Sequence, residues 1–201
     1  MKLNREQHLL VMQLLLKILE CDKRLEIAKK TLASDALFEA YDIFKVLDDQ
    51  RKFYVTDEDV CAFIKQIFPK FKQLNMEYLW HVLAKGSDRL DFDAFAQQIL
   101  PRDYGKAYKN IYYLNKQSIN ITPDLSIEIR IDFSNLMKTI HDEALTIDKC
   151  IYSLQASGVT GEQLFQCFAS HEKGYVSLDD IRETMKGFVH YIGKTGYSDP
   201  R

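Results

Sequence analysis

One short pattern of residues occurs twice in the chain, and this repeat limits the possible folds more than any other feature of the sequence. In each copy an apolar helix end precedes a polar loop, a Tyr-Val pair and a hydroxyl residue, at residues 44–56 and 165–177. Three residues after each hydroxyl comes an aspartate, Asp59 or Asp180, an arrangement typical of a capping box at the start of a helix. Each copy therefore predicts a helix, a loop, one extended apolar residue and a second helix.

A third and weaker copy lies between the other two, at residues 79–95. In this copy Leu90 takes the place that Val55 holds in the first, and Asp91 is placed to cap the next helix. These two copies are close enough along the chain to pair, so we predict that Val55 lies beside Leu90. The remaining copy, which contains Val176, has no later partner.

Two long helices are predicted by apolar residues that recur at alternating spacings of three and four, as on one face of a helix. One series is Val11, Leu14, Ile18, Cys21, Leu25, Ala28 and Leu32, and the other is Phe133, Met137, Ile140, Ala144, Ile147, Ile151 and Leu154. Such a face covers the core of its own domain or binds a partner helix, and the pattern leaves both roles open.

Composition favours the same fold class. The chain of 201 residues has only 8 Gly and 4 Pro beside 12 Phe and 11 Tyr, which favours long helices around an aromatic core. We predict an all-α protein in three parts: a long helix with paired units (1–101), a connector (102–124), and a long helix with a single unit and a tail (125–201). The net charge of −2 gives no general attraction to nucleic acid or to an anionic membrane, and no apolar run is long enough to span one.

The repeated units resemble the EF-hand, whose loop takes calcium ligands from positions 1, 3, 5, 7, 9 and 12 and has Gly at position 6. In that family an apolar residue at position 8 joins paired loops, and Val55, Leu90 and Val176 hold this position here. The order of a long helix, a paired unit and the ending Leu100-Pro101-Arg102-Asp103-Tyr104 is similar to EF-hand-like proteins of ciliated protists, many of them ciliary. The resemblance implies EF-hand-like helix-loop-helix units and a cytoplasmic, ciliary setting.

The first loop, Asp48 to Asp59, departs from the calcium-binding pattern at several ligand positions. Lys52 puts an ammonium group at position 5, where an oxygen belongs, and Phe53 replaces the glycine that permits the sharp turn. Asp59 at position 12 is shorter than the usual Glu. If the loop binds a metal ion, the resemblance assigns as its ligands Asp48, Gln50, the Tyr54 carbonyl and Asp59.

The other two loops carry no carboxylate at the ligand positions compared. The second presents Leu83, Lys85, Ser87 and Ala94 at positions 1, 3, 5 and 12, and the third presents Ala169, His171 and Lys173 at positions 1, 3 and 5. The packing positions persist while the ligands are lost. We therefore expect no cofactor and no bound calcium.

No catalytic site is predicted. The five histidines show no zinc-binding spacing, and no nucleophile and base can be nominated as a pair. His141-Asp142-Glu143 lies within the second long helix, and the amphipathic pattern predicts that it belongs to a solvated face.

The connector interleaves tyrosines with basic residues, a composition that suits contact with an acidic partner surface. The candidates for partner contact, together with Val176, are Lys106, Tyr108, Lys109, Tyr112 and Tyr113. The same tyrosines also fit an intramolecular strap that packs against the paired units.

These observations favour a non-catalytic structural or adaptor protein whose degenerate EF-hands do not bind calcium. The resemblance implies a ciliary axoneme or another microtubule-based assembly, with tubulin or axonemal proteins as partners and with no role for nucleic acid or membrane. The alternative is a calcium-binding EF-hand regulatory protein, a sensor, that acts through the loop from Asp48 to Asp59.

Overall fold

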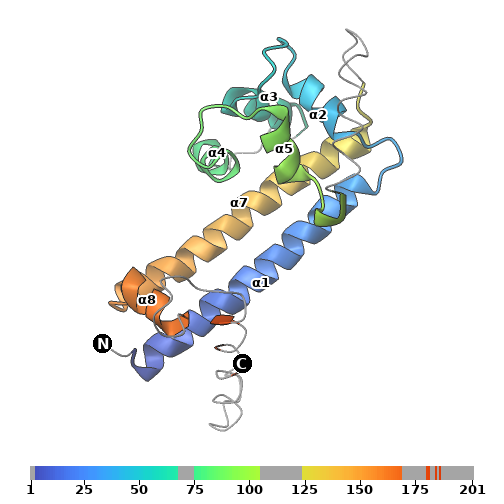
Figure 1. Ribbon diagram of the computed structural model, residues 1–201. Coiled ribbons are helices and arrows are strands. Elements are labelled where there is room, and N and C mark those ends of the chain that lie inside the picture. The colour runs from blue at the N-terminus through green and yellow to red at the C-terminus, as the bar shows by residue number, and fades with distance from the viewer. Residues whose placement is uncertain are drawn as a thin grey trace. The chain divides into compact units, whose positions relative to one another are not determined.

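The computed structural model describes residues 3–67, 75–104 and 124–168, with residues 180, 181, 184 and 186 (Figure 1). These residues are mostly helical and contain no strand, which confirms the predicted all-α class. The elements are α1 (Arg5–Ala33), α2 (Ala40–Leu47), α3 (Asp57–Ile67), α4 (Met76–Ala84), α5 (Phe92–Ile99), η1 (Arg102–Tyr104), α7 (Ile127–Ala156) and α8 (Gly161–Phe168). No helix within the described ranges has the length and apolar character needed to traverse a membrane.

The chain forms two compact units. One comprises Met1–Leu19 with Thr146–Arg201, and the other is Glu20–Leu145. Both boundaries fall inside the long helices, so α1 and α7 contribute residues to each unit. The division into three consecutive parts stays a prediction.

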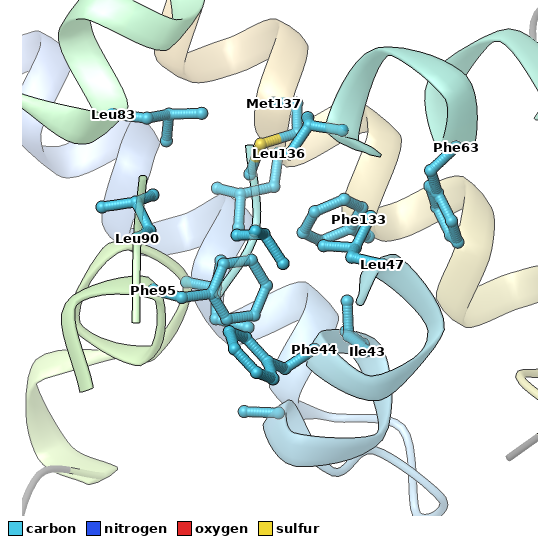
Figure 2. Close-up of a cluster of buried hydrophobic side chains, with 14 of the residues drawn as sticks. Ile43, Phe44, Leu47, Phe63, Leu83, Leu90, Phe95, Phe133, Leu136 and Met137 are labelled. Atoms are coloured by element: carbon cyan, nitrogen blue, oxygen red, sulfur yellow. The ribbon is translucent and has the colours of Figure 1, made fainter. Parts of the chain in front are cut away.

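The larger unit, Glu20–Leu145, has a hydrophobic core to which α2, α3, α4 and α5 contribute together with parts of α1 and α7. Figure 2 shows Phe44, Phe95 and Phe133 gathered in this core. The rings of Phe95 and Phe133 lie 6.1 Å apart, and Phe63 meets Phe133 edge-on at 5.4 Å. Burying each such side chain stabilises the fold by about 1.5–3 kcal/mol. The predicted aromatic core is present in this unit.

The two helix-loop-helix segments of the larger unit are joined by an antiparallel bridge between Val55 and Leu90. The Val55 N–H donates to the Leu90 carbonyl at 2.9 Å, and the Leu90 N–H donates to the Val55 carbonyl at 3.0 Å. Both side chains are buried. The predicted pairing is confirmed, and so is the cap at Asp91, whose carboxylate accepts from the Ala94 N–H at 2.9 Å at the start of α5.

The smaller unit has a core of Val11, Leu14, Leu154 and Val159. The Gln7 side chain donates to the Ser157 carbonyl at 2.9 Å and so links the beginning of α1 to the end of α7 within this unit. The predicted apolar face of each long helix is interrupted here, because Ile18 is 39% and Ile151 is 38% exposed. The spacing placed both residues on one continuous apolar face, and the core of this unit does not fully cover that face at these two positions.

Candidate functional site

Asp48 fixes one end of the first loop. It is the C-cap of α2, and its own N–H donates to the Phe44 carbonyl at 2.8 Å. Its side chain is buried, and the two carboxylate oxygens accept from the backbone N–H groups of Lys52 and Phe53, each at 2.7 Å. Hydrogen bonds to an ionised acceptor are stronger than neutral ones, so this aspartate holds the turn that follows it.

Lys52 reaches across the loop to Asp59 in the first turn of α3. Its Nζ lies 2.8 Å from Asp59 Oδ2 and 3.1 Å from Oδ1. Asp59 Oδ2 also accepts from the N–H and the hydroxyl of Thr56, at 2.8 and 2.9 Å. The capping carboxylate predicted at Asp59 is present, and it bonds the Lys52 ammonium at the same time.

The charges in the loop stabilise one another. The hydrogen bond to Asp59 raises the pKa of Lys52, and the charge of Asp48 adds to this effect against a smaller opposing effect of burial. Burial alone would raise the pKa of Asp59, but hydrogen bonds from Lys52 and Thr56 outweigh burial and hold that pKa below its ordinary value. Both groups are therefore charged at neutral pH.

Two residues of the loop adopt left-handed backbone conformations that side chains disfavour. The φ angles are 59° at Arg51 and 66° at Phe53. A non-glycine residue in this region loses about 1–2 kcal/mol relative to an ordinary helical conformation. Phe53 is also 75% exposed, so core packing does not offset the strain.

The structure places two further residues that the resemblance nominated, Gln50 and Tyr54. Gln50 is exposed in the turn after α2. The Tyr54 ring has two cations near its face, with Lys52 Nζ 5.3 Å and the Arg89 guanidinium carbon 5.4 Å from its centroid. No group of three His, Cys, Asp or Glu side chains that could hold a metal ion occurs in the described part of the chain.

The second loop is organised by packing instead of by ligands. Leu83 and Ala84 are buried, and Lys85 ends α4 in a left-handed conformation with a φ of 51°. Ser87 accepts from the indole N–H of Trp80 through its backbone carbonyl, at 3.1 Å. The structure therefore brings Leu90 to the bridge, as predicted, while positions 1 and 3 of the loop face the core and the turn.

Several predicted site residues lie outside the described residues. They are the connector candidates Lys106, Tyr108, Lys109, Tyr112 and Tyr113, and Val176 with residues 169–179 of the third loop. Their proposed contacts remain predictions.

Within the segment His141-Asp142-Glu143, Asp142 is exposed as predicted. The prediction of a solvated face is wrong for the other two residues, because His141 is 4% and Glu143 is 8% exposed. The Glu143 carboxylate pairs with the Arg24 guanidinium through two contacts, Nε to Oε1 at 2.5 Å and Nη2 to Oε2 at 2.7 Å. This hydrogen bonding lowers the pKa of Glu143, although burial opposes it. The sequence offered one signal for this burial, since Glu143 lies two helical turns after the buried Leu136 on the same helix.

His141 makes an incomplete set of contacts in its buried position. Its Nδ1 lies 3.0 Å from Asp142 Oδ1, and the Tyr78 ring meets the imidazole edge-on at 5.6 Å. Its Nε2 has no hydrogen-bond partner among the described residues, and neither does the buried hydroxyl of Ser134. No nucleophile is paired with this histidine, so the arrangement gives no catalytic geometry in the part of the chain that is described.

Comparison with known proteins gives no relative for this chain: no family model, no curated protein and no solved structure matches it.

Proposed function

We propose that the chain is a non-catalytic structural or adaptor protein whose EF-hand-like units hold their shape without calcium. The observation that carries this proposal is the position of Lys52, whose ammonium group bonds both oxygens of Asp59. A lysine placed in this way supplies the positive charge that a bound cation supplies in a calcium-binding loop. The charge is tethered to the chain and therefore does not depend on the concentration of any ion.

A calcium ion at this loop would have to break existing contacts. It would displace Lys52 from Asp59 and would compete with two backbone N–H groups for the oxygens of Asp48. The ion would then have two carboxylates and few other oxygen atoms as ligands. Because calcium affinity in such loops depends on the number and charge of the ligands, we expect weak binding. The loop is thus better suited to a fixed scaffold than to a switch.

The bridge between Val55 and Leu90 supports the same proposal. It joins the two loops, and the buried residues Val55, Leu83 and Leu90 of these loops belong to one hydrophobic core. The resemblance of the sequence to EF-hand-like proteins of ciliated protists suggests the assembly in which such an adaptor would act. That assembly would be a ciliary axoneme or another microtubule-based structure, with tubulin or axonemal proteins as partners. The connector tyrosines and Val176 would supply contacts to them.

Isothermal titration calorimetry with calcium separates this proposal from the sensor alternative. The purified chain should give no binding heat up to about 1 mM calcium, a range that covers both sensor and weak extracellular sites. Heat that disappears in Asp59→Asn, with Asp93→Asn as a matched exposed control, would establish calcium binding in this loop. That result would favour the regulatory alternative.

The adaptor role is tested with partners. Replacement of Tyr108, Tyr112 and Tyr113 by Ser should weaken co-purification of tubulin or axonemal chains while leaving the thermal unfolding midpoint unchanged. If instead stability falls and co-purification is intact, the tyrosines pack against their own chain, and the partner-contact role is rejected.

A further inference from the structure

A hollow of about 680 Å³ lies in the larger unit, beside α4 and the loop that follows it. Its volume is in the range of about 300–1,000 Å³ that ligand pockets have. The lining comes from the start of α3, from α4 and from the following loop, and the hollow is widely open to solvent. A polypeptide segment can enter and leave such an open hollow at its edges, whereas an enclosed small molecule needs walls on all sides.

One face of α4 and the loop folded back against it form most of the hollow. Glu77, Trp80 and His81 are three and four residues apart, so they lie on the same face of the helix, and all three line the hollow. The Trp80 indole N–H donates to the Ser87 carbonyl at 3.1 Å. This hydrogen bond holds the loop that carries Asp88 beside the same face of α4.

The hollow carries negative charge that its own surroundings do not balance. The described residues that line it include the carboxylates of Asp57, Glu77 and Asp88 but no Lys or Arg. All three of these residues are exposed, and none forms an ion pair with another described residue. The neighbouring Arg89 guanidinium lies by the Tyr54 ring and is not part of the lining.

The fold tolerates these carboxylates without a partner. Asp57 and Glu77 lie in the first turns of α3 and α4, where the helix dipole favours a negative charge. Asp88 lies in the loop after α4, outside any helix. A hollow lined by charge of one sign focuses its field and attracts ligands of the opposite sign. Because a single exposed ion pair contributes little, a ligand gains affinity here only if it carries several positive charges together.

We propose that this hollow binds a segment rich in arginine and lysine that belongs to a partner protein. Several positive side chains on one segment match the three carboxylates, and the open shape of the hollow admits a continuous chain. The proposal gives the adaptor a surface whose preference is opposite to that of the connector, because the basic connector suits an acidic partner.

The hollow is distinct from the charged pair of the first loop, since neither Lys52 nor Asp59 lines it. Binding of a basic segment is therefore expected whether or not that loop binds calcium. A failure of such binding would leave the proposed calcium-free scaffold standing. Calcium heat that disappears in Asp59→Asn would contradict that scaffold and leave the ligand of the hollow unchanged.

Fluorescence anisotropy of a labelled tetra-arginine peptide measures binding to the purified full chain at about pH 8, above the usual range of histidine titration. At about 50 mM salt the peptide should bind with a Kd below about 1 mM, and about 0.5 M salt should weaken binding at least about tenfold by screening the exposed charges. Trp80 is the one tryptophan of the sequence, so its emission should change over the same concentrations. A Kd above about 1 mM, or binding that leaves the Trp80 emission unchanged, would overturn the proposal.

A double variant, Glu77→Gln with Asp88→Asn, locates the contact. It removes two charges from the lining at nearly constant side-chain size and should weaken peptide binding at least about threefold. The matched control, Asp49→Asn with Asp93→Asn, removes two exposed charges of the same unit outside the lining and should bind as the wild type does. Binding is compared below the unfolding midpoint of each variant, so its loss cannot come from unfolding. An equal loss in both variants would show that the peptide responds to net charge alone, and the hollow would be rejected as its site.

Two competitors test the kind of ligand. Free arginine offers a single guanidinium group, so it should not displace the peptide at about tenfold excess. Calcium chloride at about 1 mM should also leave the peptide bound. Displacement by arginine would assign the hollow to a small cation, and displacement by calcium would assign the carboxylates to a metal ion; either result would overturn the proposal.

Discussion

Replacing Lys52 by methionine removes the ammonium group while keeping a side chain of similar length, and it should lower the free energy of unfolding by about 1–2 kcal/mol. The side chains of Lys52 and Asp59 are 21% and 12% exposed, so the pair lies between a surface pair, which contributes under about 1 kcal/mol, and a fully buried one, whose disruption costs about 3–5 kcal/mol. Asp59 keeps its hydrogen bonds from Thr56 in the variant, which moves the expected loss toward the lower part of that interval.

The shifted pKa values determine how the stability difference between the wild type and Lys52→Met changes with pH. The pKa of Asp59 is lowered in the folded protein, so its stabilising effect is present at neutral pH and is lost as the pH falls through that lowered value. The pKa of Lys52 is raised, so its contribution holds below the ordinary lysine pKa and is lost as the pH rises through the raised value. The wild type and Lys52→Met should therefore differ most at neutral pH and converge in acid.

Urea unfolding followed by circular dichroism measures the difference at pH 7 and in acid. The matched control is Lys45→Met, because Lys45 forms a more exposed pair with Asp42 one turn away on the same helix. That variant should lose no more than about 0.5 kcal/mol. A loss at Lys52 no larger than at Lys45, or a difference that is the same in acid and at neutral pH, would refute the role assigned to the Lys52–Asp59 pair.

Three further variants test the core of the larger unit. Ser134→Ala should raise the free energy of unfolding by about 0.5–1 kcal/mol in urea, because it removes a buried hydroxyl that lacks a partner among the described residues and adds helix propensity; a loss of stability would mean that the hydroxyl is satisfied. Glu143→Gln should lower the thermal unfolding midpoint at neutral pH but not in acid, since the pairing with Arg24 lowers the pKa of Glu143; an equal shift at both pH values would contradict the pairing. Phe133→Ala should lower the free energy of unfolding in urea by about 3–5 kcal/mol, because the ring is fully buried. A loss below about 1 kcal/mol would place Phe133 outside the core.

In the first two loops, patterns of neighbouring residues were enough to predict the main backbone contact. The repeated position of Val55 and Leu90 predicted their bridge, because the apolar residue before a helix cap recurs at the same place in each copy. Lys52 was recognised as an ammonium group at a ligand position, but its bond to Asp59 was not. The pairing depends on how the loop bends, and the left-handed conformations of Arg51 and Phe53 are not encoded by any glycine.

Helical periodicity did not predict burial correctly where burial depends on contacts with a segment that is distant in the sequence. His141 and Glu143 are polar residues beside an apolar stripe, and the stripe alone suggested that they face water. The Arg24 guanidinium, on α1, pairs with the Glu143 carboxylate, and this ion pair reduces the free-energy cost of burying Glu143. Conversely, Ile18 and Ile151 have the correct spacing, yet no neighbouring element covers them fully.

By itself the sequence determined the helical fold class and the pairing of Val55 with Leu90, because both follow from patterns of residues that can be recognised without knowledge of the three-dimensional contacts. The tertiary structure decided which charge meets Asp59, which polar residues enter the core and which apolar ones stay outside. The Lys52–Asp59 pair depends on how the loop bends, and the burial of polar and apolar residues depends on contacts with residues far apart in the chain. Helical spacing carries no information about what lies opposite a given face.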